Sequence, residues 1–504
     1  MIMSYIAFRV DATSQIGTGH FMRCLTLADA LKQRGVQICF VSRGLPSHLC
    51  DMLTNKNISL LSLDSNASSP TIDNDLVHSH WLGVSQAQDA QETIQALSDQ
   101  SWDWLVVDHY ALDTRWENVL RATVKKIMVI DDIADRSHDC DVLLDQNFYT
   151  DMQTRYIDKV PPHCQLLLGP HYALLRDEFR KLREQVKPRT GTVNRILVFF
   201  GGVDADNYTA RTIDVLSQIG ISGLQVDVVI GTQHPCRIEI ETRCAELGYI
   251  CHVQTNHMAE LMAVADLAIG AGGSAVWERC CLGVPTLSIC VASNQHEQIV
   301  DAAQNGLLYA LLSGDLVNAI KIHVMALFEN ESLRQLISNI AMKIVDGRGT
   351  IRIANILSMS EIKIRPANKN DSPKLFEWRN HAAIRAVSRN QDLITWEEHQ
   401  SWFIESMNDK DRILLIGYIG DDTVGVVRFD KQADFAEVSI YLVPDGGHTG
   451  KGRNLLSSAE QWLKVNRPDI KHILATVLGK NEPSQKLFSG AHYSIDTVRY
   501  LKEL

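Results

Sequence analysis

Short apolar runs alternate with amphipathic segments along the first 310 residues. The run YIAFRVDA, residues 5–12, predicts a buried strand, and the segment that follows, residues 20–35, has helical periodicity. Its apolar side chains recur on one helix face: Met22, Leu25, Ala28 and Leu31. Further apolar runs predict strands at residues 36–44, 58–63, 104–110, 126–133 and 140–147. This alternation predicts a parallel sheet covered by helices on both faces.

The same pattern starts again after a polar segment that contains a proline. EQVKPRTGTVN, residues 184–194, has the composition of a linker between domains. Apolar runs beyond it predict strands at residues 195–204, 224–231, 251–255, 266–274 and 286–292. We therefore expect two doubly wound α/β domains, residues 1–188 and 189–358. Because such sheets bind ligands beyond the carboxyl ends of their strands, two facing domains predict a cleft.

The pattern changes again at EIKIRPANKN, where a third domain is expected over residues 361–504. Adjacent apolar runs at residues 412–430 and 435–445 predict neighbouring strands joined by turns. A glycine-rich loop and an amphipathic helix follow these strands. This order is typical of an α+β domain and not of a doubly wound one.

Length, charge and cysteine content limit the classes of function. A chain of 504 residues is too long for one hydrophobic core, and its net charge of −11 argues against nucleic-acid binding. Arg9 and Asp11 interrupt the first apolar run, and no segment is long enough to span a bilayer, so we expect a cytoplasmic protein without a membrane partner. The eleven cysteines show neither CxxC nor zinc-finger spacing, which predicts reduced thiols and no bound metal.

A glycine turn stands where the first strand passes into the first helix. Gly17 and Gly19 let the chain turn sharply and let a ligand approach the backbone amides. The start of a helix favours an anion such as a phosphate. A dinucleotide fingerprint is excluded, because its third glycine would fall on the bulky Met22.

His20 lies in the first turn of this predicted helix. The positive end of the helix dipole disfavours a charged imidazole, which leaves a neutral ring that can accept a proton. The alternative is a histidine that only caps or packs the helix. The glycines beside it and the flanking Arg9, Asp11 and Arg23 favour the functional interpretation. We expect Asp11, Gly17, Gly19 and Arg23 to contact the substrate.

These residues form part of a longer pattern. FRVDATSQIGTGHFMRCLTLADAL resembles the RxDxSxxIGxGHxxRxxxLA signature of the nucleotide-sugar hydrolases of pseudaminic acid synthesis, which are relatives of MurG-type glycosyltransferases with the GT-B architecture. Thr13 stands where that family often has serine. The resemblance covers residues 5–310 and continues in the segments VVDHYALD, VIDDIADRSHDCDVLLDQNFY, LLGPHYALLRDEF, FFGGVDADN and IGAGGSAVWERCCLGVPTLSICVASNQ.

The resemblance implies a substrate and roles for several residues. The substrate would be UDP-2,4-diacetamido-2,4,6-trideoxy-β-L-altropyranose, and the products would be UDP and the free sugar. His20 is similar in position to a base that activates the attacking water. Tyr110 either lines the sugar side of the cleft or is an ordinary aromatic at a strand end. Asp131 and Asp132 either orient the sugar or its water or cap a turn, and for Asp132 we expect the turn.

A second glycine turn, DLAIGAGGSAVWERC, is expected to hold the nucleotide. Gly270, Gly272 and Ala275 satisfy GxGxxG/A, but the next strand ends in Ser293 and Asn294 instead of an acidic residue, which argues against NAD. Backbone amides of Gly272, Gly273 and Ser274 can face a pyrophosphate. By resemblance, Glu278 accepts hydrogen bonds from the ribose, and its alternative is a solvated helix carboxylate. The remaining candidates near the sugar-nucleotide are Asn294, Gln295, Gly201 and Gly202.

The third domain resembles the GNAT acetyltransferases. The loop DGGHTGKGRNLL and the tail NEPSQKLFSGAHY carry this resemblance, which implies that acetyl-CoA binds at Gly450, Lys451, Gly452 and Asn481. Gly447 departs from the family, since Gln or Arg is usual there. UDP-sugar and acetyl-CoA are thus the expected partners, both small molecules.

The segment EWRNHAAIRAVSRNQDLITWEEHQSWF is similar to an acetyltransferase that acylates the 4-amino group of a UDP-sugar one step earlier in the same pathway. Phe488 stands where many relatives have a tyrosine general acid. Tyr441, a water molecule or nothing fills that role. Glu437 and Tyr441, on the strand before the loop, are the nearest candidates for acetyl transfer, and the alternative for them is a cross-strand surface pair. Two further hypotheses remain open for the chain: a GT-B glycosyltransferase, and a nucleotide-sugar binding protein with an inactive GNAT domain.

Overall fold

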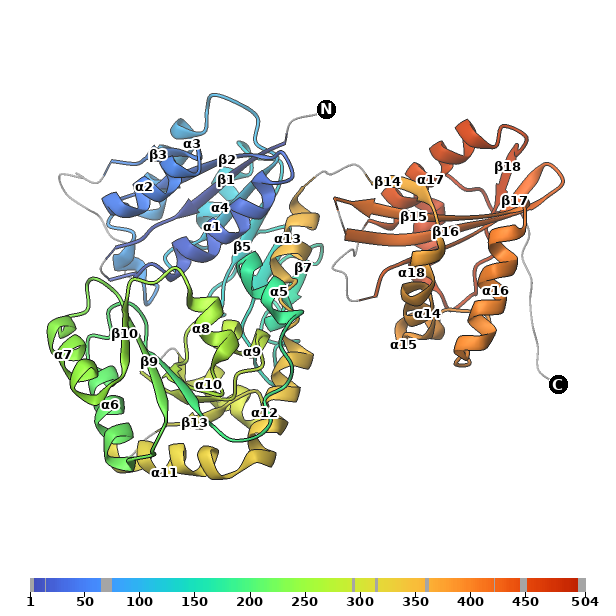
Figure 1. The fold of residues 1–504 in the computed structure, drawn as a ribbon. Coiled ribbons are helices and arrows are strands. Elements are labelled where there is room, and N and C mark those ends of the chain that lie inside the picture. Colours follow the sequence, from blue (N-terminus) through green and yellow to red (C-terminus); the bar gives the residue numbers. More distant parts are fainter. Residues whose placement is uncertain are drawn as a thin grey trace. The chain divides into compact units, whose positions relative to one another are not determined.

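The computed structural model describes residues 4–13, 15–64, 75–291, 295–312, 316–358, 362–420, 422–444 and 451–496. The chain divides into two compact units, Met1–Ile351 and Arg352–Leu504. Unit 1 contains two parallel sheets, and unit 2 contains one mixed sheet (Figure 1).

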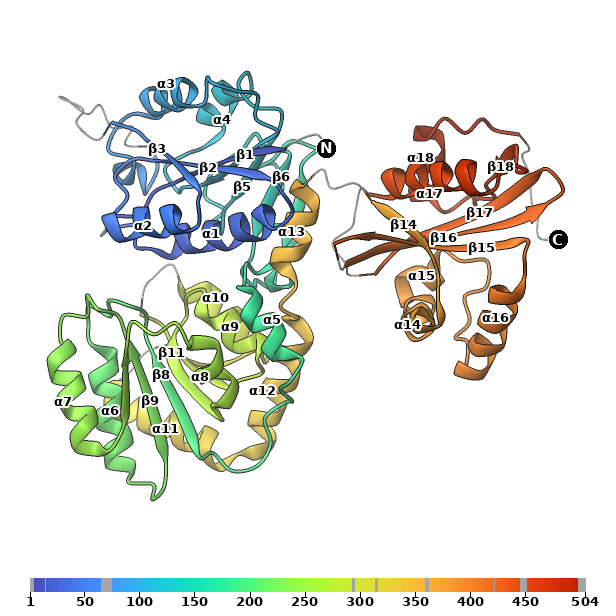
Figure 2. The same ribbon diagram turned by 45° about the horizontal axis from the view of Figure 1, so that its top comes forward.

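The first sheet of unit 1 has seven strands in the order β3-β2-β1-β4-β5-β6-β7, all of them parallel. Its strands are β1 (Tyr5–Val10), β2 (Gln37–Ser42), β3 (Ser59–Ser62), β4 (Trp104–Asp108), β5 (Ile127–Ile130), β6 (Val142–Asp145) and β7 (Gln165–Leu168). Its helices are α1 (Gly19–Lys32), α2 (Ser47–Asn55), α3 (Gln86–Ala96), α4 (Thr114–Leu120) and the short η1 (Ser79–Trp81) and η2 (Pro170–Tyr172). Figure 2 shows α1 and α2 on one face and α3 and α4 on the other. We call this part the first lobe.

The second sheet has six parallel strands in the order β10-β9-β8-β11-β12-β13 and forms the second lobe. Its strands are β8 (Arg195–Phe199), β9 (Gln225–Ile230), β10 (Ile250–Val253), β11 (Leu267–Ala271), β12 (Thr286–Ile289) and β13 (Tyr309–Leu311). Its helices are α6 (Tyr208–Ile219), α7 (Arg237–Leu247), α8 (Met258–Val264), α9 (Ala275–Cys281), α10 (His296–Gln304), α11 (Leu316–Glu329) and α12 (Glu331–Ile344). The predicted pair of doubly wound domains is confirmed.

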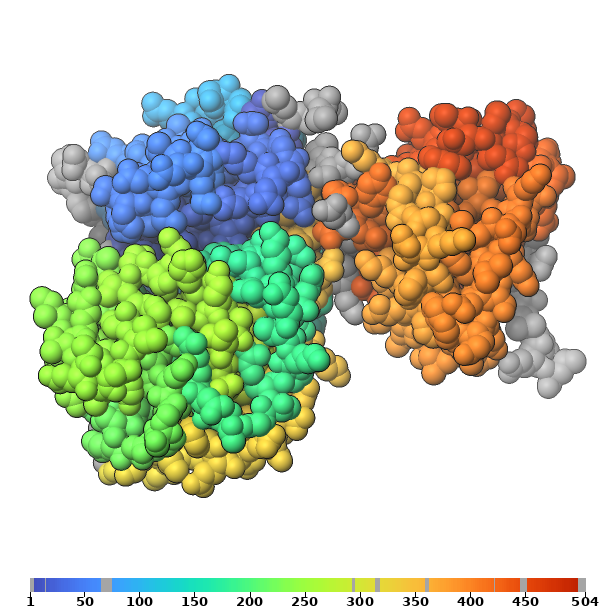
Figure 3. Space-filling model, in the orientation of Figure 1, coloured from blue at the N-terminus to red at the C-terminus, as the bar shows by residue number. Residues whose placement is uncertain are grey.

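The two lobes of unit 1 are connected more than once. Helix α5 (Asp177–Arg183) leads out of the first lobe, and its Phe179 belongs to the same hydrophobic cluster as Trp277 of α9. The chain returns at the start of α13 (Gly349–Leu357), where the Thr350 hydroxyl donates to the carbonyl of Leu175 at 2.8 Å. The atoms of the two lobes meet in the space-filling view (Figure 3).

The strand order identifies where each lobe can bind a ligand. Successive strands run outward from β1 in one direction and from β4 in the other, so the order reverses between these neighbours; the same reversal occurs between β8 and β11. Ligands of open parallel sheets bind at this reversal, beyond the carboxyl ends of the strands. In the first lobe this point lies beside His20, and in the second lobe beside the turns that carry Gly202 and Gly272.

Unit 2 is built on a five-stranded sheet in the order β14-β15-β16-β17-β18. The strands are β14 (Lys363–Pro366), β15 (Arg412–Ile419), β16 (Asp422–Gln432), β17 (Phe435–Leu442) and β18 (His472–Leu474). The helices are α14 (Ser372–Asn380), α15 (Ala382–Ala386), α16 (Trp396–Asn408), α17 (Gly452–Asn466) and α18 (Glu482–Gly490), preceded by the short η4 (Lys369–Asp371). Figure 2 shows α17 and α18 on one face and α14, α15 and α16 on the other. The predicted α+β domain is confirmed.

Candidate functional site

His20 rests on a buried carboxylate at the end of the neighbouring strand β4. Its Nδ1 lies 2.6 Å from Oδ1 of Asp108, and 12 % of the imidazole side chain stays exposed. Arg23, one helical turn after His20, donates from Nε to Oδ2 and from Nη2 to Oδ1 of the same carboxylate, both at 2.7 Å. The sequence alone did not single out Asp108, although it lies at the strand-order reversal.

The ionisation of Asp108 fixes the tautomer of His20. Burial alone would raise the pKa of Asp108, but the charges of Arg23 and His20 and their hydrogen bonds hold it well below its usual range. A carboxylate only accepts hydrogen bonds, so Nδ1 of His20 carries the proton that it donates. The lone pair of the neutral ring therefore lies on Nε2, as a general base requires.

Asp132 belongs to this cluster, contrary to the expectation that it caps a turn. Its Oδ2 accepts from Nη1 of Arg23 at 2.9 Å, and its Oδ1 accepts from the hydroxyl of Tyr110. The backbone turn is instead closed by Asp131, whose Oδ2 accepts from the amide of Ala134 at 3.0 Å. Burial and the charge of Asp132 raise the pKa of Tyr110 well above its ordinary value, so this phenol stays protonated.

Three aromatic rings lie beside His20: Tyr110, which the sequence identified, and Trp81 and His78, which it did not. The ring of Tyr110 lies edge-on to His20, with centroids 4.7 Å apart, and is stacked on Trp81 at 5.5 Å. His78 completes the group, 4.6 Å from Trp81 and 5.2 Å from Tyr110. The signal available in the sequence was the dense HSHW at residues 78–81. These rings form an apolar wall next to the base.

Asp11 lies beneath this site and not at its surface. The side chain is 1 % exposed, and its Oδ1 accepts from Nη1 of Arg9 at 2.6 Å, from the Ser42 hydroxyl at 3.0 Å and from the Arg43 amide at 2.7 Å. These bonds tie β1 to β2. The geometry therefore favours a supporting role over the substrate contact expected of Asp11.

The first glycine turn is open, as its proposed role requires. Gly17 has a φ of +75°, a conformation that glycine adopts readily, and its amide donates to the carbonyl of Thr13 at 2.8 Å. A Cβ atom at Gly17 or Gly19 would meet no other atom within 4 Å. Both glycines are exposed just before His20.

The second glycine turn packs closely against helix α10. A Cβ at Gly272 would lie 2.2 Å from Cδ1 of Ile299, whereas one at Gly273 would approach only Nε2 of Gln295, at 3.8 Å. Ser274 is exposed and precedes α9. Gln295, the residue before α10, thus lies beside this turn, and Asn294 lies outside the described residues.

Glu278 and Gly202 complete the expected nucleotide side. Glu278 lies 3.6 Å from Nη2 of Arg176, and burial raises its pKa although Arg176 opposes that shift. Gly202, exposed after β8, accepts from the amide of Gly231 at 3.0 Å. A Cβ at Gly231 would lie 2.3 Å from the carbonyl oxygen of Gly202, so this close approach of the two turns requires glycine at position 231.

Asn147 joins the two lobes through its side-chain amide. Its Oδ1 accepts from Nε1 of Trp277 on α9 at 3.0 Å, and its Nδ2 donates to Oδ2 of Asp132 at 3.3 Å. Through Arg23 and Asp108, this chain of hydrogen bonds extends from the helix behind the second glycine turn to His20. The segment after β6 adds an ion pair between Arg155 and Glu297 of α10, at 3.3 Å.

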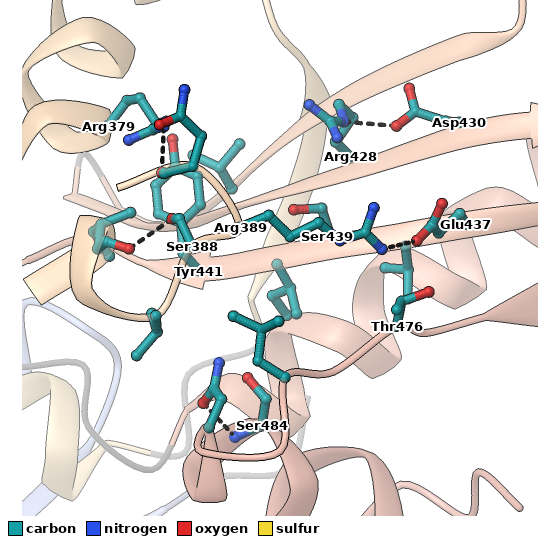
Figure 4. Close-up of a pocket in the computed structure, with 18 of the residues that line it drawn as sticks. Arg379, Ser388, Arg389, Arg428, Asp430, Glu437, Ser439, Tyr441, Thr476 and Ser484 are labelled. Atoms are coloured by element: carbon teal, nitrogen blue, oxygen red, sulfur yellow. Dashed lines mark hydrogen bonds and ion pairs between the residues drawn. The ribbon is translucent and has the colours of Figure 1, made fainter. Parts of the chain in front are cut away.

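Unit 2 contains a cavity of about 640 Å³ between its separating strands (Figure 4). Strands β17 and β18 pair in parallel only from Phe435 to Glu437. Beyond this point the cavity opens between residues 438–441 of one strand and residues 476–478 that follow the other. Such a separation exposes backbone groups that an extended ligand can use.

Of the expected acetyl-CoA residues that the structure describes, Asn481 lines this cavity, whereas Lys451 and Gly452 do not. Gly452 begins α17, and the buried Lys451 precedes it, while Gly450 and Gly447 lie outside the described residues. Asn481 lines the cavity and caps α18, because its Oδ1 accepts from the amide of Ser484 at 3.2 Å.

Glu437 and Tyr441 both line the cavity, as does Phe488. Glu437 is paired with Nη2 of Arg389 at 2.7 Å, and Figure 4 shows this ion pair among the residues that line the cavity. Burial raises the pKa of Tyr441, so its phenol stays protonated at neutral pH. The alternative of a cross-strand surface pair is not what the structure favours, since both side chains face the cavity.

Comparison with known proteins agrees with this division. Residues 361–493 match the family model described as an acetyltransferase (GNAT) domain. A UDP-2,4-diacetamido-2,4,6-trideoxy-beta-L-altropyranose hydrolase of Campylobacter jejuni is 24 % identical over 304 residues, which are 60 % of this chain and 97 % of that protein. The chain thus fuses a GT-B-like region similar to this hydrolase with a GNAT domain.

Two further similarities concern the whole architecture. The uncharacterized protein MJ1062 of Methanocaldococcus jannaschii is 24 % identical over 500 residues, 96 % of this chain and 95 % of that one. A UDP-glucosyltransferase of Polygonum tinctorium matches with a TM-score of 0.50 at 13 % identity, over 71 % of this chain and 99 % of its own, which shows the GT-B-like fold. The hydrolase similarity and the GNAT domain together indicate an enzyme.

Neither a metal-binding cluster nor a membrane-spanning helix occurs within the described ranges. No group of three or more His, Cys, Asp or Glu side chains that could hold a metal ion occurs in the described parts of either unit. Among the helices whose residues are described, none has the length and apolar character needed to cross a membrane.

Proposed function

We propose that the GT-B-like region hydrolyses UDP-2,4-diacetamido-2,4,6-trideoxy-β-L-altropyranose to UDP and the free 2,4-diacetamido sugar. The similarity to the Campylobacter jejuni hydrolase suggests this substrate. The observation that carries the proposal is the 2.6 Å contact between Nδ1 of His20 and the ionised Asp108, because it leaves Nε2 as the basic nitrogen.

In the proposed reaction, Nε2 of His20 takes a proton from a water molecule whose oxygen attacks C1 of the sugar. The bond between C1 and the diphosphate oxygen breaks, and its electron pair leaves with UDP. The protonated imidazole is stabilised by Asp108, and Arg23 holds that carboxylate in place through two hydrogen bonds, one to each oxygen. Tyr110 donates its only O–H to Asp132, so its phenol oxygen can accept a hydrogen bond from a sugar hydroxyl or amide group.

The second lobe would hold the UDP part of this substrate. Amides of Gly272, Gly273 and Ser274 would face the diphosphate, with Gly202 on the neighbouring turn. Glu278 would accept from the ribose, and its partial exposure beside Arg176 is compatible with that role. Asn294 and Gln295 would face the sugar-nucleotide from the segment before α10.

For the GNAT domain we propose transfer of an acetyl group to the 4-amino group of the UDP-sugar precursor. Acetyl-CoA supplies the acetyl group when bound, with its pyrophosphate at the loop of Gly450, Lys451 and Gly452 and its pantetheine near Asn481. Glu437 would draw a proton from the attacking amine, and Tyr441 would give one to the departing thiolate. Both substrates are small molecules of the cytoplasm, which is where we propose that the protein acts.

Incubating the purified chain with the diacetylated UDP-sugar tests the hydrolase assignment. We expect equal amounts of UDP and free sugar from the wild type and almost none from His20→Ala. Product that forms only when a second sugar or lipid acceptor is added would favour a glycosyltransferase instead. Release of CoA from acetyl-CoA and the 4-amino UDP-sugar, reduced in Tyr441→Phe, tests the second activity; no release would indicate an inactive GNAT domain.

A further inference from the structure

Arg279 is a buried cation without a carboxylate partner. It lies on α9 with 1 % of its surface exposed, and its Nη2 donates to the carbonyl of Ala271 at 2.6 Å. Over the residues that the structure describes, no Asp or Glu oxygen forms an ion pair with this guanidinium, and its Nε has no hydrogen-bond partner there. By contrast, the equally buried Arg9 is paired with two carboxylates, Asp11 and Asp89.

A buried charge with so little compensation is costly, so its retention needs an explanation. Removing a guanidinium from water is unfavourable unless opposite charge and hydrogen bonds compensate. Burial lowers the pKa of Arg279 to about 10, so the side chain is still a cation at neutral pH. The adjacent acid, Glu278, is paired with Arg176, and its charge opposes the lowering of the Arg279 pKa only in part.

The charge lies at the strand-order reversal of the second lobe. A Cβ at Gly270 would lie 2.7 Å from Nη1 of Arg279 and 2.1 Å from the carbonyl oxygen of Phe199. The guanidinium is therefore beside the carboxyl ends of β11 and β8, the two central strands. The turns that carry Gly272 and Gly202 start from these two strand ends.

We propose that Arg279 is a positioning residue for anion binding, whose missing counter-charge is the diphosphate of a nucleotide held by the two glycine turns. It acts without touching the ligand, through the backbone of Gly270 and Ala271 and through a weakly screened field. This inference rests on the proposed function, since it assumes that the second lobe binds UDP. It names Arg279 as the source of the positive charge that balances the diphosphate in the second lobe.

The deciding experiment compares UDP and uridine binding to the full-length wild type and to Arg279→Met by calorimetry. We expect Arg279→Met to lower the affinity for UDP at least tenfold and to leave the affinity for uridine unchanged, because only UDP carries the counter-charge. The melting temperature without ligand should stay equal or rise, since a buried charge has been replaced by an apolar chain of similar length. A purely structural Arg279 would give the opposite result: a lower melting temperature and unchanged UDP affinity.

A matched control and a second variant complete the test. Arg334 is also buried and forms no ion pair among the described residues. Unlike that of Arg279, its guanidinium donates to three backbone carbonyls, those of Leu327, Phe328 and Gly191, away from both glycine turns. Arg334→Met should therefore lower stability and leave UDP affinity unchanged. Arg279→Lys serves if the Met variant does not fold. A lysine buried there has a lowered pKa, so its UDP affinity should fall at least tenfold below that of the wild type at pH 9, with a smaller gap at pH 6.

The outcomes separate this inference from the proposed function. A wild type that binds neither UDP nor uridine would refute the assigned nucleotide. A wild type that binds UDP, together with Arg279 variants of equal affinity at both pH values, would overturn only the role of Arg279.

Discussion

At the scale of single residues, the proposed base, His20, depends on the charged groups that lie behind it. His20 is partly buried at the end of a glycine turn, and its tautomer is set by Asp108 on the adjacent strand. Arg23 keeps that carboxylate ionised and ties it to Asp132. The reactive nitrogen is therefore determined by three charged groups that come from three separate segments.

The first prediction concerns the carboxylate behind His20. Replacing Asp108 by Asn offers an amide N–H to Nδ1, which favours the tautomer with its proton on Nε2 and removes the basic lone pair. We expect kcat for UDP release to fall about 100-fold or more, with a small change in KM, by analogy with other carboxylate–histidine pairs. Steady-state UDP release measures this effect.

Asp103→Asn is the matched control, because Asp103 precedes the same strand and binds Lys125 and the amide of Tyr5. Its activity should match that of the wild type. Equal rates for the Asp108→Asn and wild-type proteins would show that His20 does not act as a base.

A second prediction concerns His138, which is buried between Glu117 and Asp131. Burial alone would lower its pKa, but Glu117, 2.7 Å from Nδ1, and Asp131 raise it to about 9. Because its pKa is higher in the folded state, His138 contributes its full stabilisation at pH values below the unfolded-state pKa, near 6.5. This contribution is lost as the pH rises through the folded-state pKa, about 9. We expect a loss of about 3 kcal/mol over this range.

Urea unfolding of the wild type and of His138→Gln at several pH values measures this loss. The neutral glutamine cannot titrate, so its free energy of unfolding should change less between pH 6.5 and 9.5. Parallel curves for the two proteins would mean that His138 is already neutral at pH 6.5.

At the scale of elements, the segment after β6 links the two lobes. Asn147 accepts from Trp277 on α9 and donates to Asp132, while Thr150 donates its amide to Asp301 of α10 at 2.7 Å. Helix α9, which follows the second glycine turn, and helix α10, which follows Gln295, are thus connected to the cluster around His20.

A third prediction follows from this link. Asn147→Leu has a similar volume but removes both side-chain hydrogen bonds, so Asp132 and Arg23 lose one of their fixed neighbours. We expect kcat for hydrolysis to fall about tenfold, while the affinity for the product UDP changes little, since the glycine turn is intact. Trp277→Phe should act in the same direction.

Gln146→Met provides the comparison, because Gln146 is equally buried and its Oε1 accepts from the amide of Leu174, away from Asp132. A stability effect alone would lower the melting temperature in both variants and kcat in neither. A decrease in kcat of equal size in both would contradict the specific role of Asn147.

The element scale also shows how far the sequence could predict this structure. The alternation of apolar runs predicts both parallel sheets, because each buried strand is nearly all apolar. The missed strands β7, β13 and β18 are three or four residues long, too short to give a pattern. His20 was identified from local features, the glycines before it. Asp108, Asn147 and Arg279 were not, because their roles arise only when distant segments become neighbours.

At the scale of the whole molecule, two units with separate hydrophobic cores suggest separate ligand responses. Among the described residues, no hydrophobic cluster contains side chains of both units. A ligand that binds only the folded form stabilises the unit that holds it. Thermal unfolding of the full-length chain should therefore show two transitions, one raised by UDP and the other by CoA.

Differential scanning calorimetry of one sample with each ligand in turn checks this prediction. At a ligand concentration about 100 times Kd, the responding unit gains about 2.7 kcal/mol, which raises its melting temperature by several degrees. His20→Ala keeps the UDP response, since the glycine turns bind the nucleotide, and Tyr441→Phe keeps the CoA response. A single transition moved by both ligands would show instead that the two units unfold together, so that binding in one active site stabilises the other.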